Sequence, residues 1–213
     1  MMLTGENLRL AQDLLETIKF INQKGWSEAT STNYSVRTII QNEIIISRSG
    51  VDKSQFRLED FLMIDLEGQV LPKYSLPHLK SSAETEIHTA LYKIFPDVNC
   101  VLHTHSILGT VLSTSSLDNN ILTFENLEIL KGLEGNKTHE VREEIPIVRN
   151  SQDMQEILRQ MRGKFNDNIH GFLIQGHGLY TWAKDIATAK RHIETFEFLF
   201  EYQYLMRRMS WPI

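Results

Sequence analysis

The chain lacks the features of a disulfide-linked, secreted or membrane-spanning protein. Cys100 is its one cysteine among 213 residues, so no disulfide can form within the chain, which fits a reducing compartment. No apolar run approaches the roughly 20 residues that a membrane-spanning helix needs. The N-terminal stretch MMLTGENLRLAQDLLETIKF has no basic start followed by an apolar block, so it does not read as a signal peptide. We therefore expect a cytoplasmic protein with no membrane partner.

An excess of basic residues is also missing. The net charge is −5, whereas sequence-independent binding of nucleic acid needs a basic surface, so we expect no nucleic-acid partner. An anionic substrate would have to be held by local groups, because the overall field repels it. The composition is 41% hydrophobic and 23% charged, with no repeat, low-complexity tract or linker-like stretch. We therefore expect a single domain over residues 1–213.

Hydrophobic periodicity predicts alternating helices and strands. A stripe that includes Leu8, Leu15 and Ile18 predicts a helix ending near Gly25. The stretch EIIIS is rich in β-branched residues and predicts a strand. The predicted helices cover residues 6–24, 84–94, 106–116, 128–132 and 151–162 and a long final segment after a cap at Asp185. The predicted strands cover residues 34–38, 43–47, 97–105, 121–124 and 145–148, with two short strands within 61–71 and two more within 171–183.

This interleaving predicts an α/β protein. Several of the strands are joined by tight turns, which favours antiparallel pairing. We expect a three-layer α/β/α sandwich, with helices on both faces of a central mixed, largely antiparallel sheet. The loop from Lys73 to Glu84 precedes a helix for which Ser82 is the expected N-cap.

The segment VLHTHS places two histidines at the end of a predicted strand. His103 and His105 are two residues apart, so both side chains point to one face and can reach one ion. A catalytic zinc site uses three protein ligands and keeps one open position. His177, between Gly176 and Gly178, is the best third candidate. The alternative is ordinary polar histidines at a strand end and at a hairpin turn.

The other histidines have plainer explanations. His88 and His192 lie inside predicted helices, where a structural role is expected. His170 precedes the predicted strand GFLI, and we expect it to be exposed.

Two carboxylates are candidate acid/base groups. Glu84 opens a helix after KSSA, and Glu128 lies in the block FENLEILKGLEG. Either can move a proton if it is buried beside a metal. The alternative for Glu84 is an acid favoured by the helix dipole. The alternative for Glu128 is a solvated residue of a short helix, although its neighbours Leu127 and Ile129 are apolar.

Three small polar segments could bind an anion: residues 31–33, 48–50 and 80–82. Backbone N–H groups at glycine turns and helix starts, together with serine hydroxyls, make phosphate sites. Ser81 and Ser82, just before a helix, are the strongest of these candidates. Each segment alone is more often a plain cap or turn.

The order TSTNYSVR, SRSGVD, KSSAETEIHTALY, VLHTHS and GHG resembles the class II aldolase family, over roughly residues 8–205. Members include zinc aldolases and epimerases of sugar phosphates, and they typically form tetramers with the site between subunits. The resemblance implies one zinc per subunit and an acid/base role for Glu84. Ala83 departs from the aldolase pattern, in which a serine precedes that glutamate. The implied zinc ligands are His103, His105 and His177, and the implied phosphate-binding residues are Asn33, Ser49, Gly50 and Ser82.

Three segments are similar to a dehydratase branch of the family: SAETEIHTALY, FENLEILKGLEG and THEVREEIPIVRNSQDM. In that branch the acid/base glutamate of the middle block corresponds to Glu128. The resemblance therefore implies removal of water from a ketose phosphate, with Glu128 as acid/base and Glu84 in reserve. One alternative is an aldolase or 4-epimerase acting on another ketose phosphate. Another is a non-catalytic, zinc-stabilised interaction protein like the adducins.

Overall fold

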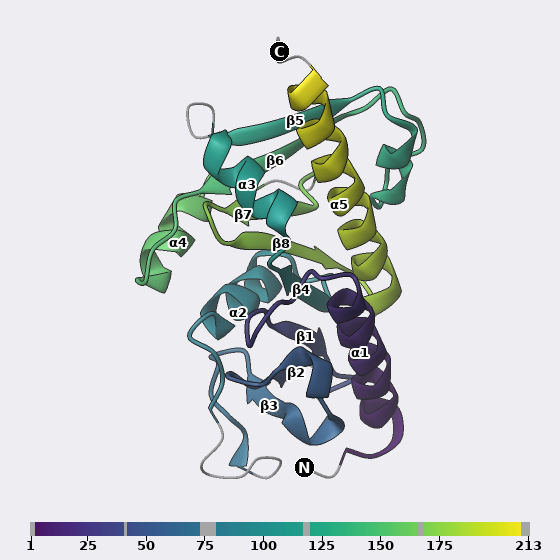
Figure 1. Cartoon of the computed structure of the whole chain (residues 1–213). Coiled ribbons are helices and arrows are strands. Elements are labelled where there is room, and N and C mark those ends of the chain that lie inside the picture. Colours follow the sequence, from purple (N-terminus) through teal and green to yellow (C-terminus); the bar gives the residue numbers. More distant parts are fainter. Residues whose placement is uncertain (1–2, 41, 73–79, 117–119, 166–167, 210–213) are drawn as a thin grey trace. The chain divides into compact units, whose positions relative to one another are not determined.

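The computed structural model of the chain describes residues 3–40, 42–72, 80–116, 120–165 and 168–209 (Figure 1). These residues cluster into two compact units. The first is Met1–Thr104 with Trp182–Ala189, and the second is His105–Thr181 with Lys190–Ile213. Each unit is built on four of the eight strands. The expectation of a single domain over residues 1–213 stays a prediction, and part of the loop expected after Lys73 lies outside the described residues.

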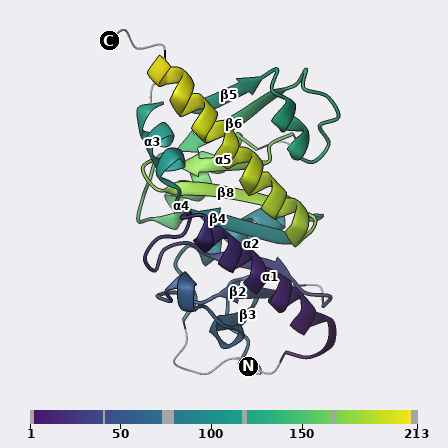
Figure 2. The same cartoon turned by 45° about the vertical axis from the view of Figure 1, so that its right-hand side comes forward.

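The first unit is built on the strands β1 (Tyr34–Arg37), β2 (Glu43–Ser47), β3 (Phe61–Asp65) and β4 (Cys100–Thr104). They run in the order β3-β2-β1-β4, and every neighbouring pair is antiparallel. Figure 2 shows helix α1 (Gly5–Gln23) in front of these strands and helix α2 (Thr85–Ile94) behind them. Both helices begin within one residue of their predicted starts, because their apolar stripes pack on the sheet.

The prediction of two strands within residues 61–71 is wrong. Only β3 forms, and the chain returns through a single bridge between Ile64 and Val70. The turn itself is as expected, with Gly68 at a φ of +80°. The return cannot lengthen beyond Leu71, because Pro72 has no backbone N–H to donate to a ladder.

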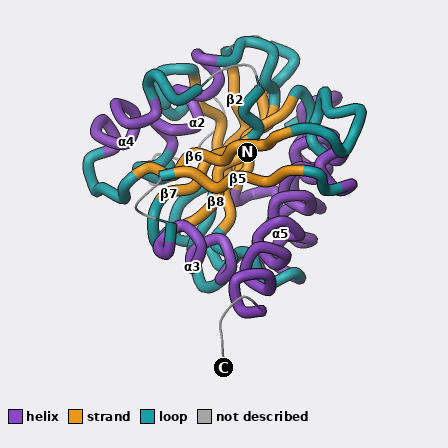
Figure 3. Tube along the Cα trace, turned by 90° about the horizontal axis from the view of Figure 1, so that it is seen from above, coloured by secondary structure: helices purple, strands orange, loops and turns teal. Residues whose placement is uncertain are grey.

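The second unit holds β5 (Ile121–Glu125), β6 (Arg142–Val148), β7 (Gly171–Ile174) and β8 (Gly178–Ala183), whose last two residues cluster with the first unit. Their order is β8-β7-β6-β5, with β6 and β7 parallel and the other two pairs antiparallel. The expected mixed, largely antiparallel pairing is therefore confirmed. Figure 3 shows α3 (Ile107–Ser115) and α5 (Ile186–Met209) on one side of these strands and α4 (Met154–Met161) on the other.

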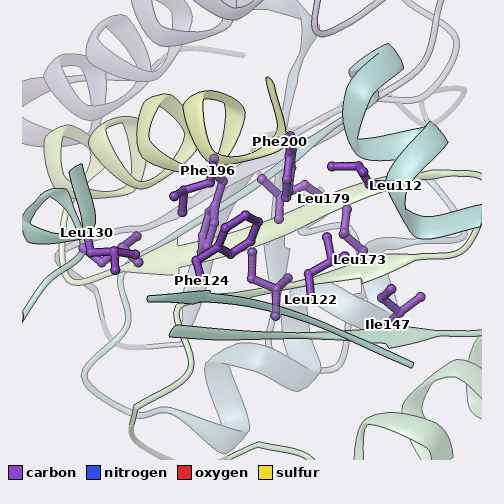
Figure 4. Close-up of a cluster of buried hydrophobic side chains, with 12 residues drawn as sticks. Leu112, Leu122, Phe124, Leu130, Ile147, Leu173, Leu179, Phe196 and Phe200 are labelled. Carbon is purple, nitrogen blue, oxygen red and sulfur yellow. The ribbon is translucent and has the colours of Figure 1, made fainter. Parts of the chain in front are cut away.

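One apolar cluster forms the core of the second unit (Figure 4). Its largest side chains include Phe124, Phe196 and Phe200, and the rings of Phe196 and Phe200 stack with centroids 6.2 Å apart. The predicted stripe of α5 is buried, as expected from its helical spacing. The predicted cap of this helix is also confirmed, because the Asp185 carboxylate accepts a 2.7 Å hydrogen bond from the Thr188 N–H. The other members of the cluster are Leu112, Leu122, Leu130, Leu133, Ile145, Ile147, Leu173, Leu179 and Leu199.

None of the helices within the described ranges combines the length and the apolar character that crossing a bilayer requires.

Truncating Phe200 should destabilise the protein strongly. This side chain is fully buried, so Phe200→Ala leaves a cavity and should lower the free energy of unfolding by about 3–5 kcal/mol. Its neighbour Glu201 is exposed on the same helix, and Glu201→Ala should change that free energy by no more than about 0.5 kcal/mol. Urea denaturation of both variants measures the difference. Equal losses would contradict the assignment of this core.

Candidate metal centre and acid–base residues

His103 is the fourth residue of β4, a strand whose five residues are all buried. Its side chain is fully buried, and its backbone N–H donates a 3.0 Å hydrogen bond to the carbonyl of Asn33. Its ring nitrogen Nε2 lies 3.6 Å from Oε2 of Glu84. The first unit therefore brings a predicted metal ligand and a predicted acid/base group together.

Glu84 is positioned at the start of α2. It is the residue just before the helix, so the prediction that Ser82 is the N-cap is wrong. The physical reason is a turn before the helix, in which the Thr85 N–H bonds to the Ser82 carbonyl and the Glu84 N–H bonds to the Ser82 hydroxyl at 3.3 Å. The Glu84 side chain is only 19% exposed and accepts a 2.5 Å hydrogen bond from Nδ2 of Asn33.

Asn33 itself is held from behind by His88. The ring nitrogen Nε2 of His88 is hydrogen-bonded to Oδ1 of Asn33, and its Nδ1 is 2.7 Å from the hydroxyl of Ser35. Burial lowers the pKa of His88 to about 3, against a smaller opposing effect of the Glu84 charge, so this imidazole is neutral at pH 7. The structure thus places Asn33, which resemblance assigns to phosphate, next to the carboxylate of Glu84, a predicted acid/base group.

The second unit brings the other two histidines together. The rings of His105 and His177 lie edge to face, with centroids 4.5 Å apart. His177 occupies the turn between β7 and β8, where Gly176 adopts a φ of +62° that favours glycine. Helix α3 holds this turn through two side chains: the Ser113 hydroxyl accepts from the Gly176 N–H at 2.9 Å, and the Thr110 hydroxyl donates to the His177 carbonyl at 3.0 Å.

The three histidines form a donor set that suits a divalent metal. Only Thr104 separates His103 from His105, so the covalent chain keeps His103 within reach of the other pair. Within the second unit, His177 lies edge to face with His105, so the spacing along the chain and this contact bring the three imidazoles into one candidate ligand group. Neutral imidazoles are ordinary zinc ligands, and three of them leave a position for substrate. By donor chemistry, the residues present fit the metal that resemblance implies.

The predicted phosphate segments come partly together. The Ser49 N–H donates to the Lys80 carbonyl at 3.4 Å, which joins the loop at residues 48–50 to the segment at 80–82. Ser49 and Gly50 are exposed, and Gly50 has a φ of +74°. Ser81 and Ser82 are half-buried. In the third segment the Ser31 hydroxyl instead closes its own turn, by donating to the Glu28 carbonyl.

Glu128 begins the short 3-10 helix η4 (Glu128–Gly132), whose bounds match the prediction. Its side chain is 70% exposed, forms an ion pair with Lys131, and has a carboxylate oxygen 3.7 Å from Nδ1 of His139. The hydrogen bond from Lys131 lowers the pKa of the Glu128 carboxyl. Its apolar neighbours in sequence therefore do not bury it, and its acid/base role stays a prediction.

Sequence reasoning missed a buried ion pair in the second unit. His170 was expected to be exposed, which is wrong: its side chain is 12% exposed, and Nδ1 lies 3.0 Å from Oε1 of the buried Glu143. Its Nε2 lies 2.7 Å from the carbonyl of Glu134, whose N–H donates to His192 at 2.9 Å. The available signal was the alternation of Glu143 with Ile145 and Ile147, which puts all three on one face of β6.

Comparisons with known proteins show what this chain is similar to. The family model described as Class II Aldolase and Adducin N-terminal domain matches residues 12–204. A methylthioribulose-1-phosphate dehydratase from Picosynechococcus sp. is 41% identical over 210 residues, which cover 98% of this chain and 97% of that protein. A protein of the same name from Xanthomonas campestris is 39% identical over 204 residues, covering 95% and 92%.

Solved structures support the fold. An L-fuculose 1-phosphate aldolase matches with a TM-score of 0.75 at 17% identity, covering 96% of this chain and 89% of that chain. An L-fuculose-1-phosphate aldolase from Thermus thermophilus matches with a TM-score of 0.74 at 22% identity, covering 95% and 97%. The class II aldolase-like α/β fold expected from the sequence is therefore confirmed.

The buried ion pair at His170 should make stability fall as pH rises. Burial alone would lower the pKa of His170, but the hydrogen bond and charge of Glu143 and the Glu134 carbonyl outweigh it and raise the pKa above 6.5. The stabilisation is therefore fully present below pH 6.5 and is lost as pH rises through the raised pKa. Urea denaturation as a function of pH measures this decline, and His170→Gln should flatten it. A decline of equal slope in the variant would show that another group is responsible.

Proposed function

Because the chain belongs to the class II aldolase and adducin family, we propose that it is a metal-dependent hydro-lyase acting on 5-methylthioribulose 1-phosphate. The product would be 2,3-diketo-5-methylthiopentyl 1-phosphate, and the reaction would serve methionine salvage. The observation that carries the proposal is the identity of about 40% over nearly the whole chain to relatives with that dehydratase name. The pairing of a histidine donor set with a nearby carboxylate supports it independently.

We assign the metal to His103, His105 and His177 and propose zinc, one ion per subunit. Three neutral ligands preserve the full charge of a divalent ion, and the bound metal would supply Lewis-acid polarisation of the substrate carbonyl. Neighbouring residues hold the backbone of two of the three ligands in place. These contacts are the backbone bond from His103 to Asn33 and the bonds from α3 to the His177 turn.

The reaction needs one group that removes the C3 proton and one that protonates the departing C4 hydroxyl. The enol that remains, with its hydroxyl on C3, relaxes to the 2,3-diketone. We assign acid/base catalysis of these proton transfers to Glu128. Glu84 is the second candidate carboxylate for the same role. An exposed Glu128 fits a site shared between subunits, because a residue that serves a neighbouring chain has to lie on the surface.

The sugar phosphate would be bound by Ser49, Gly50, Ser81 and Ser82, with Asn33 close by. The hydrogen bond between Ser49 and Lys80 supports this assignment, because it brings the glycine turn and the serine pair into one part of the first unit. Backbone N–H groups and hydroxyls suit a phosphate. Such local groups are needed on a chain whose net charge is −5.

We further propose that the protein is a cytoplasmic homotetramer. Exposed apolar side chains gather on α3 and α5 of the second unit, which suits burial against another copy. On α3 these are Ile107 and Val111, and on α5 they are Phe198, Leu205, Met206 and Met209. The one cysteine, Cys100, is a buried free thiol, so the fold uses no disulfide, which fits a reducing compartment.

The second candidate is an aldolase or 4-epimerase acting on another ketose phosphate. The favouring observation is that Glu84 lies beside His103, since the family resemblance gives that glutamate the acid/base role in aldolases. The identity of the product separates the two candidates.

The purified, zinc-loaded protein should convert 5-methylthioribulose 1-phosphate to a product lighter by one water, and a chelator should abolish the conversion. Mass spectrometry measures both. Glu128→Gln should lower kcat about 10²–10⁴-fold, which is the usual contribution of one acid/base group. Glu125→Gln, a nearby exposed carboxylate paired with Arg142, is the matched control and should retain normal turnover. Unchanged substrate, or cleavage into two fragments, would refute the dehydratase.

Removing one histidine should remove the metal. His177→Ala takes away a ligand, so zinc retained after dialysis should fall from about one ion per subunit to a small fraction. The exposed His139 serves as control, and His139→Ala should retain zinc fully. Elemental analysis of both variants measures the metal content. Full retention by His177→Ala would remove this histidine from the ligand set.

A further inference from the structure

An unbroken chain of hydrogen bonds leads from the interior of the first unit to Glu84. It starts at the hydroxyl of Tyr92, which lies 2.8 Å from the hydroxyl of Ser35. It continues through His88 to Asn33 and ends on Oε2 of Glu84. Four of the five residues are at least 96% buried, and the fifth carries the carboxylate next to His103.

The two ends of the Asn33 amide fix the direction of every bond. Its Nδ2 donates to Oε2 of Glu84, so its Oδ1 is the acceptor that faces His88. The Nε2 of His88 must then carry the proton, which leaves its Nδ1 as an acceptor. Ser35 therefore donates to His88 and accepts from Tyr92. Because burial keeps His88 neutral, this tautomer alone satisfies both of its neighbours.

Without His88, the Asn33 amide could adopt two orientations of nearly equal shape. In one orientation the Nδ2 group of Asn33 donates to Oε2 of Glu84. In the other, the lone pairs of Oδ1 would face the lone pairs of that carboxylate oxygen. A protonated Nε2 on His88 excludes the second orientation, because that orientation would bring two donors together. His88 thus determines which face of the amide meets the carboxylate.

We propose that His88 is a positioning residue, which acts through Asn33 to hold Oε2 of Glu84 beside His103. The catalytic consequence rests on the proposed function, whereas the hydrogen-bond chain itself does not. The main role of the Asn33 side chain is therefore to position the Glu84 carboxylate, in addition to any contact with phosphate. His88 was expected to be structural because of its place in a helix. Two hydrogen bonds, through Asn33, connect it to the carboxylate of Glu84.

Substitution of His88 tests the role in catalysis. In His88→Gln, the amide nitrogen can replace Nε2 as donor to Asn33, whereas His88→Met fills the space without a donor. His88→Met should lower kcat about 10–100-fold with KM little changed. Losses of this size are usual when a residue that orients a functional group, without touching the substrate, is removed. His88→Gln should recover most of this loss. The matched control is Ile87→Val, which removes a buried methylene from the same helix and should lower stability without lowering kcat.

Equal kcat in His88→Gln and His88→Met would overturn the proposal. So would a loss of kcat in Ile87→Val that matches its loss of stability, since the effect would then be general loosening of α2.

Nitrogen-15 NMR of the His88 imidazole provides a readout that needs no activity. The proposal predicts a neutral ring protonated at Nε2 in the wild-type protein at pH 7, and the same tautomer throughout pH 5.5–8.5. A ring protonated at Nδ1, or a charged ring, would overturn it even if the variants fail to fold. If this tautomer is found in a protein without dehydratase activity, the proposed function fails and the hydrogen-bond chain stands.

Discussion

The candidate site depends on the hydrogen bond from Asn33 to Glu84. An acid at the start of a helix would ordinarily turn toward water, yet this one is held 3.6 Å from the ring of His103. Asn33 is suited to the task because it uses two different groups. Its main-chain carbonyl accepts a hydrogen bond from the backbone N–H of His103, and its side-chain Nδ2 donates to the Glu84 carboxylate. Asn33, the residue just before β1, therefore fixes the spacing between a predicted metal ligand and a predicted proton-transfer group.

Helix α3 has the corresponding role in the second unit. Ser106, directly after His105, caps this helix by accepting the Gly109 N–H at 3.1 Å, so the helix begins as soon as the histidine is placed. One and two turns later, Thr110 and Ser113 hold the turn that carries His177. The edge-to-face packing of His105 and His177 is a consequence of these local polar contacts. The first unit thus holds His103 through a backbone–backbone bond to Asn33, whereas the second holds the His177 turn through side chains of α3 that bond to its backbone.

The sequence predicts those parts of the fold that depend on local pattern. Three elements form where their periodicity places them: the strand EIIIS, the paired strands around GHG and the apolar stripe of α5. The apolar residues that define each pattern are the residues that become buried in the fold. The His103–His105 spacing predicts a shared strand face, but β4 ends at Thr104, so His105 lies just after the strand. Two features were not predicted from the sequence. A local turn at Ser82 displaces the cap by two residues, and His170 is buried against Glu143, which lies 27 positions away in the sequence.

The most direct test of the account is X-ray absorption spectroscopy of the zinc-loaded protein. Zinc held by the three histidines should show nitrogen and oxygen neighbours at about 2.0–2.1 Å, with the multiple-scattering signature of three imidazoles and with no sulfur. Zinc coordinated by fewer than three imidazoles, or by the Cys100 thiolate, would contradict a metal centre built from His103, His105 and His177.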